Sequence, residues 1–536
     1  MAAAPSQSAE EVLRYVTQEM EWRNRALHAM IAEMSKLKQL QNSVMPVNSL
    51  PAEIFLEIFK HLRNSQGKIQ DVVRVTHTCK LWRNIALEAP ELWAAFPINR
   101  LDVITAFLQR SRARPLKLFL TNPQEHMHRI ARRLEPHLHR VRVLRVRYPV
   151  NQRIETLFSR FTSPVPMLEE LVVERAPRSL PPDLDRALVS LPELFGGFLP
   201  EQSLRKLHIL NMCFLPRFSA PSVLVDLEIR QNFTADRILP VRDLIELLRQ
   251  CPLLEKVRIA GIPLVGPANS PDFITPLPRL KRLSLFSSGR LVSEMLSHLH
   301  LPHTTRVRLK SQYFEPGIGY DMIPWGLESA LPCLTGFKRL ELVFDESRFV
   351  LRAFHSPDEY IEPALEISVI ISCDDDVLFS DFLSDWPFDV SQVETLVLSG
   401  PSVECSDMLG PAIHELFRHL PNVNFMRVVS MSSFNATALV RCLSHDLGLR
   451  GPDDPEDDPG VPYTFLPKLT VLELCDIKGG RPLFVPVTQT VDLRRKGGRL
   501  REVNLSLVDG WDPDHAEAAT IISRGAVRVT MDNGDE

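Results

Sequence analysis

The first regular hydrophobic pattern in the chain runs from about Glu10 to Val44. Its apolar residues recur at alternating steps of three and four, the spacing of a coiled-coil seam on one long helix. The seam positions are Leu13, Val16, Met20, Arg23, Leu27, Met30, Met34, Leu37, Gln41 and Val44. Pro46 ends the pattern, since proline disrupts a helix interior. We expect residues 1–45 to form a coiled-coil-like helix that self-associates through residues 11–44 or folds back on the next segment. A lone disordered helix is the third outcome.

A second helical pattern opens the next segment, which we assign to residues 46–96. Its apolar positions cover one broad face of a short helix. They are Ile54, Phe55, Ile58, Phe59 and Leu62. Ser49 is suited to cap this helix, and Pro51 suits its first turn because the missing N–H is not needed there. The stretch from Asn64 to Gly67 is a polar break whose glycine can end a helix.

The same segment continues with a further apolar series at helical spacing. Its members are Val72, Val75, Cys79, Trp82 and Ile85. Pro90 closes the series, because a proline disfavours helix in the residue before it. Two or three helices of this size bury little core of their own, so such a bundle commonly needs a partner or an adjoining domain. From the spacing alone, an ordinary helical hairpin is equally compatible.

The rest of the chain, assigned to residues 97–531, repeats one short motif. An apolar residue is followed three positions later by a second and, two positions after that, by a third, as in Leu168, Leu171 and Val173. The clearest copies begin at Leu168, Leu204, Leu224, Leu254, Leu280, Phe337, Val393, Leu469 and Leu500, with weaker ones at Val141, Thr304 and Val423. The last two apolar positions of each copy lie on one face of a short strand.

Helix-like stretches, such as that from Asp243 to Leu248, lie between the copies. One strand and one helix per unit, stacked, predict an α/β fold of the leucine-rich-repeat solenoid type. The copies are irregularly spaced and mostly lack the usual Asn or Cys after the strand, so the repeats are degenerate. An ordinary α/β domain with parallel strands is the alternative. The expected architecture is an N-terminal helix, a small helical bundle and then the solenoid.

Acidic residues cluster at three places in this region and after it. Asp453–Gly460 and Cys373–Asp376 lack the alternating oxygen ligands and closing Glu of a calcium loop, so we expect the first to be an exposed loop between repeats. Residues 532–536 are expected to be a frayed acidic tail.

Composition narrows the class of protein. A chain of 536 residues with 44% hydrophobic content can bury a large core, and its net charge of −4 gives no global attraction to nucleic acid. No apolar run approaches the ~18 residues of a membrane span, and the N-terminus lacks a secretory pattern. The eight scattered cysteines favour reduced thiols. We therefore expect a cytoplasmic or nuclear protein with no membrane or nucleic-acid partner.

A cluster of histidines and arginines is the nearest approach to a chemical site. The histidines are His126, His128, His137 and His139, and the arginines include Arg129, Arg140, Arg142, Arg145 and Arg147. Cationic neighbours oppose a metal ion, so we expect the arginines to line the exposed side of a strand and a solvated helix. A nucleic-acid or acidic-partner patch is an alternative. The chain has no nucleophile elbow, phosphate-cradling loop or Cys-x-x-Cys pair, and we predict no catalytic residue, metal or cofactor.

Residues 46–96 resemble an F-box. The resemblance rests on Leu50-Pro51-Ala52-Glu53-Ile54, on Ile58-Phe59, and on the later Val75, Cys79 and Trp82, in that order and at fitting spacing. The link between the first two helices is slightly longer than usual. The whole chain is similar to F-box proteins with degenerate leucine-rich repeats, a kind abundant in mushroom-forming fungi.

That resemblance implies a substrate-recognition subunit of a Skp-cullin-F-box ubiquitin ligase. The F-box would bind a Skp-type adaptor, and through it a cullin-RING ligase, while the repeats present a concave face to an unknown target protein. The residues implied in adaptor binding are Leu50, Pro51, Ile54, Ile58, Phe59, Leu62, Val75, Cys79 and Trp82. A scaffold that uses the F-box outside a ligase and a binder of acidic surfaces remain open, and a hydrolase is a more distant alternative.

Overall fold

The structure, a computed structural model, describes most of the chain between residues 9 and 532. The positions outside the described part are 1–8, 67–68, 99, 122–126, 149–159, 176–199, 201, 212–221, 231–238, 262–263, 266–273, 312–321, 325, 327–328, 346–347, 359–360, 371–388, 401–412, 414–415, 445–464, 478–482, 497–499, 509–527 and 533–536. The two predicted acidic stretches and His126 therefore lie outside it. The chain divides into two compact units, Met1–Leu168 and Glu169–Glu536.

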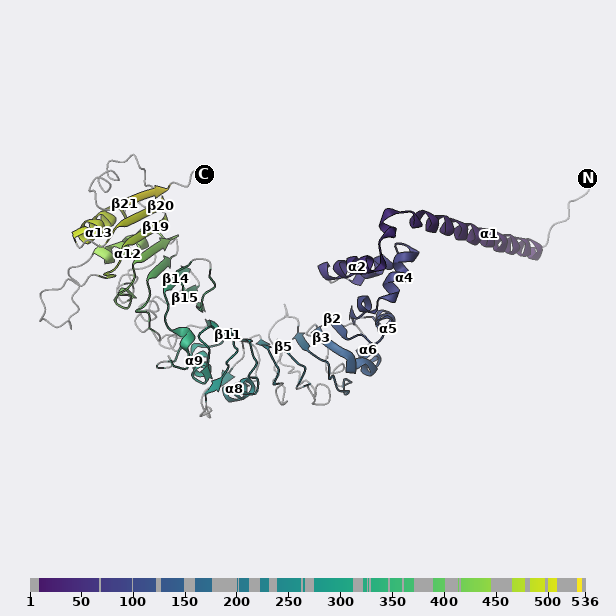
Figure 1. Cartoon of the computed structure of the whole chain (residues 1–536), viewed down its shortest axis with the longest axis horizontal. Helices are drawn as coiled ribbons and strands as arrows, with labels where there is room; N and C mark the ends of the chain where they lie inside the picture. The colour runs from purple at the N-terminus through teal and green to yellow at the C-terminus, as the bar shows by residue number, and fades with distance from the viewer. Residues whose placement is uncertain are drawn as a thin grey trace, which may run out of the picture. The chain divides into compact units, whose positions relative to one another are not determined.

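The first unit begins with helices (Figure 1). They are α1 (Ala9–Ser43), α2 (Ala52–Gln66), α3 (Ile69–Thr76), α4 (Lys80–Glu88), α5 (Leu101–Arg110) and α6 (Met127–Leu134), with 3-10 helices η1 (Pro46–Ser49), η2 (Pro90–Trp93) and η3 (Glu135–Arg140). Helix α1 matches the predicted seam helix closely and buries none of its side chains. One sequence-based alternative, that this helix folds back on α2–α4, is therefore wrong.

One local prediction for this segment was wrong. Ser49 does not cap α2, because it belongs to η1, where its hydroxyl donates to the Pro46 carbonyl over 2.7 Å. The second apolar series spans two helices, α3 and α4, so the described residues of the segment form three α-helices with α2, within the two or three expected. Cys79 is the N-cap of α4: its Sγ accepts a hydrogen bond from the backbone N–H of Trp82 at 3.5 Å. It therefore separates the two helices instead of packing within one.

A small parallel sheet follows within the first unit. Its strands are β1 (Ala95–Pro97), β2 (Leu116–Thr121) and β3 (Val141–Tyr148), paired in that order. Arg142, Arg145 and Arg147 are exposed on β3, as predicted. Arg140 is not: it is only 5% exposed and its guanidinium donates to the carbonyls of Arg112 and Arg114 after α5. The correction has a simple reason, since a helix end leaves carbonyls that a buried cation can satisfy.

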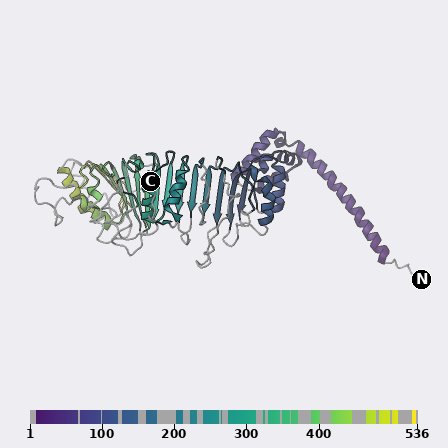
Figure 2. The same ribbon diagram turned by 90° about the horizontal axis from the view of Figure 1, so that it is seen from below.

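The second unit is built on a large sheet, most of whose strands are parallel. Its main strands are β4 (Glu170–Arg175), β5 (Lys206–Leu210), β6 (Asp226–Arg230), β8 (Lys256–Ala260), β11 (Arg282–Phe286), β13 (Arg306–Ser311), β14 (Arg339–Asp345), β15 (Arg348–Phe354), β16 (Leu365–Ile370), β17 (Thr395–Ser399), β18 (Phe425–Val429), β19 (Val471–Ile477), β20 (Glu502–Val508) and β21 (Arg528–Asp532). Figure 2 shows them lying side by side. Asp532, assigned to the tail from the sequence, is the last residue of β21.

The predicted motif positions are in register across this sheet. Leu171 is paired with Leu207, Leu207 with Leu227, and Leu227 with Val257, all in parallel. Side chains at these positions are buried. Because strand side chains alternate between faces, the intervening polar residues gather on the opposite face.

One part of the sheet departs from simple sequential stacking. β16 pairs with β13, and β14 pairs with β17, both in parallel, while β15 lies between β16 and β14 and is antiparallel to each. After β13 the chain skips two positions in the sheet and forms β14. It then returns through β15 to β16, which lies next to β13, and continues at β17 on the other side of β14. The sequence motif identified β14 but neither β15 nor β16.

Helices α8 (Val241–Arg249), α9 (Gly289–Ser297), α12 (Ser433–Ser444) and α13 (Phe484–Lys496) connect strands of this unit, and η6 (Pro332–Leu334) precedes β14. Short strand pairs join β7 (Leu239–Pro240) to β9 (Leu264–Val265) and β10 (Thr275–Pro276) to β12 (Leu299–His300). The helices bury apolar faces, as α8 does with Leu244, Ile245 and Leu248. Among the described residues, no helix combines the length and apolarity needed to cross a membrane.

Candidate functional site

Helix α2 separates its apolar residues onto two faces. Phe55 and Phe59 are each 1% exposed and face the interior of the helical bundle. Ile54, Ile58 and Leu62 are 47%, 38% and 41% exposed. Residues four apart lie on the same side of a helix, so each set forms a continuous stripe. A short helix that is apolar on two sides buries one of them and leaves the other in solvent.

The buried stripe of α2 packs against α4 through aromatic rings. Trp82 lies with its ring centroid 5.4 Å from that of Phe55 and 5.5 Å from that of Phe59, and the two phenylalanines are 5.9 Å apart. All three pairs are tilted, an arrangement that aromatic rings favour. Val72 and Val75 of α3 are buried in the same bundle. These contacts hold α2 with its other stripe outward.

Two exposed residues directly before α2 add to this surface. Pro51 immediately precedes the helix, and its carbonyl accepts the backbone N–H groups of Ile54 and Phe55 at 3.1 and 3.3 Å. Leu50, four residues before Ile54, is itself exposed. We call the set Leu50, Ile54, Ile58 and Leu62 the outer row. Exposed apolar side chains that form a continuous surface are typical of a protein-interaction site.

A residue that the sequence did not single out supports this arrangement. The indole N–H of Trp82 donates to Asn48 Oδ1 over 2.8 Å, and Asn48 Nδ2 donates to the carbonyl of Asn42 over 2.7 Å. Asn48 therefore joins the end of α1 and the 3-10 turn η1 to α4. Because η1 leads directly into Leu50 and Pro51, this pair of hydrogen bonds orients the start of the outer row. No periodic pattern marks a single bridging asparagine.

The nine residues predicted to bind an adaptor therefore fall into two groups. Those on the surface are Leu50, Pro51, Ile54, Ile58 and Leu62. Phe59 and Val75 are buried in the bundle, whereas Cys79 and Trp82 are partly buried. The first group and the partly exposed Cys79 and Trp82 can contact another protein directly, whereas Phe59 and Val75 support the surface from beneath.

Comparison with known families gives one match in this region. The model of the F-box-like family matches residues 47–96, which include η1, α2–α4, η2 and most of β1. Residues 47–96 form an F-box-like domain. A search of the curated proteins finds no match to the chain. F-box domains generally bind Skp-type adaptors, so this domain is a protein-interaction module.

The second unit offers a different surface, made by the polar face of its sheet. Neighbouring strands place residues opposite each other in a middle row. In strand order this row is His208, Glu228, Arg258, Ser284, Arg308, Glu366, Arg352, Glu341, Val397, Arg427 and Glu473. Charges of opposite sign meet at many of its steps, an arrangement that stabilises neighbouring strands.

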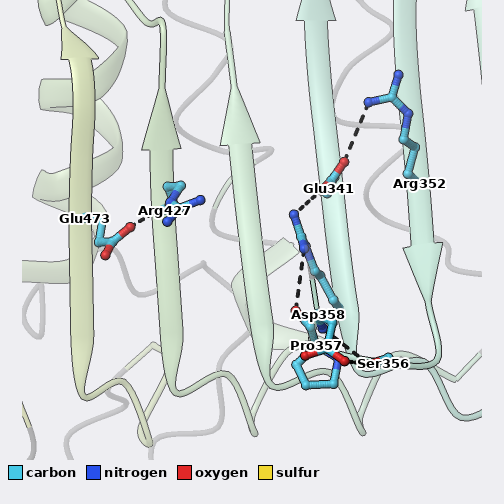
Figure 3. Close-up of polar contacts among 8 residues, drawn as sticks. Glu341, Arg352, Ser356, Pro357, Asp358, Arg427 and Glu473 are labelled. Carbon is cyan, nitrogen blue, oxygen red and sulfur yellow. Dashed lines mark hydrogen bonds and ion pairs between the residues drawn. The ribbon is translucent and has the colours of Figure 1, made fainter. Parts of the chain in front are cut away.

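The middle row is best connected around the antiparallel strand. Arg352 on β15 lies 3.6 Å from Glu341 and 3.7 Å from Glu366. Farther along, Arg427 and Glu473 are 2.6 Å apart (Figure 3). Beside the row, the nearly buried Arg339 donates to Glu341 and stacks over Phe354, with its guanidinium carbon 5.1 Å from the ring centroid. These contacts are non-covalent and position charge rather than activate a nucleophile.

Three of the described thiols of the second unit are also unsuited to covalent chemistry. Burial raises the pKa of Cys251 and of Cys333 to about 12, and that of Cys442 to about 11. A thiol with so high a pKa carries almost no reactive thiolate at neutral pH. Of the predicted histidine cluster, His137 has its pKa lowered by burial and by the charges of Arg140, His139 and Arg133. The described residues form no group of three or more metal-ligating side chains.

Proposed function

We propose that the protein is the substrate-recognition subunit of a Skp-cullin-F-box ubiquitin ligase. The observation that carries this proposal is the outer row of the F-box-like domain, which exposes three apolar side chains on one face of α2 and Leu50 just before that helix. Burial of apolar surface is the main favourable term in protein association, at roughly 25 cal/mol per Å². A Skp-type adaptor that covers the row would supply that burial.

In this proposal the chain performs no covalent chemistry of its own. The adaptor joins the F-box-like domain to a cullin that carries a RING subunit and a ubiquitin-conjugating enzyme. The second unit holds the target protein. Linking the two binding events raises the effective concentration of the target near the ligase.

We further propose that the sheet of the second unit is a degenerate leucine-rich-repeat solenoid whose charged face receives the target. The in-register stacking of Leu171, Leu207 and Leu227 on successive parallel strands supports this proposal. The inverted order of β14, β15 and β16 is an insertion of a hairpin and return strand into that stack. A reduced compartment, cytoplasmic or nuclear, suits the free buried cysteines.

Helix α1 supports a second proposal, that two copies of the chain associate through residues 11–44. Its seam residues Leu13, Met20 and Leu27 are all more than half exposed. A helix of 35 residues with no tertiary packing is unusual in water, because helical stability in proteins comes mostly from a covered apolar face. A second α1 would cover the seam.

The deciding experiment for the ligase assignment is binding of the full chain to a purified Skp-type adaptor. The test variant is Leu50→Ala/Pro51→Ala, and the control is Met167→Ala, an exposed apolar residue of the same unit. Tight binding that the double variant abolishes and the control retains would support the proposal. A folded wild-type chain that does not bind the adaptor would refute it.

A non-ligase scaffold is the remaining candidate, because an F-box-like domain alone does not specify a cullin. The complex of chain and adaptor should therefore be tested for capture of a cullin. Capture of the cullin would exclude the scaffold function. An adaptor complex that does not recruit the cullin would favour it.

A further inference from the structure

Three adjacent strands of the second unit carry only one sign of charge on their polar face. The outward positions of β8, β11 and β13 hold six basic residues and no acidic residue. They are Lys256, Arg258, Arg282, Arg306, Arg308 and Lys310. We call this set the cationic patch. On the strands to either side, acidic residues return, with Asp226 and Glu228 on β6 and Glu366 on β16.

Strand pairing arranges the patch as a regular grid. Lys256, Arg282 and Arg306 lie opposite one another, and Arg258 and Arg308 flank Ser284 in the next row. Neighbouring strands are about 4.8 Å apart, and outward residues along one strand are about 6.6 Å apart. The side chains of the four arginines are between 44% and 63% exposed. The grid is therefore open to a ligand.

The central strand of the patch, β11, carries fewer cations than the strands on either side. Ser284 and Phe286 occupy the outward positions of β11 after Arg282. The ammonium group of Lys310 lies 5.3 Å from the ring centroid of Phe286, within reach of a cation–π contact. A hydroxyl and an aromatic ring between rows of cations give a ligand both polar and apolar contacts.

Carboxylates at the rim satisfy part of this charge. Glu228 lies 3.7 Å from Arg258, Glu366 lies 3.1 Å from Arg308, and Glu362 pairs with Arg282 and Arg306. Asp226 also lies opposite Lys256 on the neighbouring strand, so at least four carboxylates face six cations. The Glu362 side chain is 61% exposed, and ion pairs this exposed are worth little, so an incoming anion can replace them at small cost. Glu228 and Glu366 are only 14% and 21% exposed and stay beside their arginines as the rim.

We propose that the cationic patch binds an extended acidic segment of the target protein. In an extended chain, alternate side chains project on the same side about 6.6 Å apart, which matches the spacing of the patch rows. Anionic groups at every second position would meet successive rows, and an apolar side chain would meet Phe286. Carboxylates and phosphorylated side chains share the required chemistry. One part of this inference rests on the proposed function, namely that the protein which carries the acidic segment is a substrate of the ligase.

The rim argues for a short peptide segment over a nucleic acid. A nucleic-acid strand carries a phosphate at every nucleotide and gains affinity from a groove that stays cationic along its path. Here Glu228 on one side and Glu366 on the other interrupt the positive charge after three strands. An acidic segment of a few residues fits within this limit, whereas a longer polyanion would cross both carboxylates.

The test measures fluorescence anisotropy of short labelled peptides with the full chain. Three peptides are used, which carry glutamate, phosphoserine or glutamine at every second position. The fourth probe is a single-stranded oligonucleotide with the same charge as the anionic peptides. The test variant is Arg258→Gln/Arg308→Gln. The matched control is Arg242→Gln/Arg290→Gln, which removes two exposed cations from helices α8 and α9 of the same unit.

The wild-type chain should bind at least one anionic peptide better than the glutamine peptide, with an affinity that falls as salt rises. The patch variant should bind that peptide about tenfold more weakly or worse, and the control should stay within about twofold. Whether glutamate or phosphoserine binds better identifies the source of the anion. Circular dichroism spectra verify that both variants are folded.

Three results would overturn the inference: equal binding of anionic and glutamine peptides, equal losses in the patch and control variants, or binding of the oligonucleotide alone. The same preparations are assayed for adaptor binding. Peptide binding without adaptor binding would refute the ligase assignment and leave the patch as an acidic-peptide site. The reverse result would refute the patch alone.

Discussion

The indole N–H of Trp82 donates a 2.8 Å hydrogen bond to the side-chain oxygen of Asn48. This bond links two parts of the F-box-like domain that lie 34 positions apart in the chain. Trp82 also fills the space beneath Phe55 and Phe59, so one side chain supports both the bundle core and the turn that precedes Leu50. The outer row therefore depends on the partly buried residues Asn48 and Trp82.

Removing either end of this bond should loosen the start of the domain. We expect Asn48→Ala and Trp82→Phe each to lower the stability of the domain by about 1–2 kcal/mol, the usual cost of an unpaired, partly buried donor or acceptor. The double variant should lose clearly less than the sum of the two, because both changes remove the same bond. Hydrogen exchange of amides in η1 and α4 measures the effect, and strictly additive losses would contradict the coupling.

The two faces of α2 should respond differently to truncation. Ile58→Ala should weaken adaptor binding while changing stability little, because Ile58 is largely in solvent. Phe59→Ala should destabilise the domain by about 3–5 kcal/mol through the cavity it leaves. Thermal unfolding and adaptor titration, measured on both variants, separate the two roles. A stability loss at Ile58 equal to that at Phe59 would mean that the exposed face is part of the core.

Arg140 should contribute to stability although it looks like a surface arginine in the sequence. Arg140→Ala removes charge-assisted hydrogen bonds to Ser111, Arg112 and Arg114, and we expect a loss of about 3 kcal/mol. Arg132→Ala, an exposed arginine of the neighbouring α6, is the matched control and should change stability by less than about 0.5 kcal/mol. Equal effects in chemical denaturation would rule out the capping role.

Thiol reactivity should report both burial and adaptor binding. The raised pKa values of Cys251, Cys333 and Cys442 keep these groups protonated at pH 8, so an alkylating reagent should modify them only after denaturation. Partly exposed Cys79 should react in the native chain and become protected when the adaptor binds. Site-resolved mass spectrometry follows each thiol. Rapid native labelling of Cys251 would show that the second unit opens.

Self-association should depend on the seam of α1 and not on its other apolar residues. Leu27→Asp/Met30→Asp places charges at two seam positions and should convert a dimer of the full chain into a monomer. Tyr15→Asp, an exposed apolar position off the seam, should leave the dimer intact. Sedimentation equilibrium distinguishes the two species. A wild-type chain that is monomeric at all concentrations tested would end the proposal.

Helices and strands whose apolar residues recur at a regular spacing were predictable from the sequence. The residues that end these elements or bridge between them were not. The seam of α1, the stripe of α2 and the motif strands each have apolar residues at a period that only one element satisfies. Cys79 escaped because its spacing to Val75 and Trp82 also fits one continuous helix, and only the cap geometry separates α3 from α4. Asn48 and Arg140 escaped because a bridging or capping polar residue carries no periodicity.

For this protein the sequence alone determined the F-box resemblance, the apolar row of α2 and the alternation that gives the sheet one buried and one polar face. Those features follow from local spacing, which acts within a few residues. The tertiary structure decided which α2 stripe is covered, the inverted order of β14, β15 and β16, and the gathering of Arg258, Arg282 and Arg308 on neighbouring strands. These depend on pairings between residues far apart in the chain, where register and burial, not local preference, set which side chains meet.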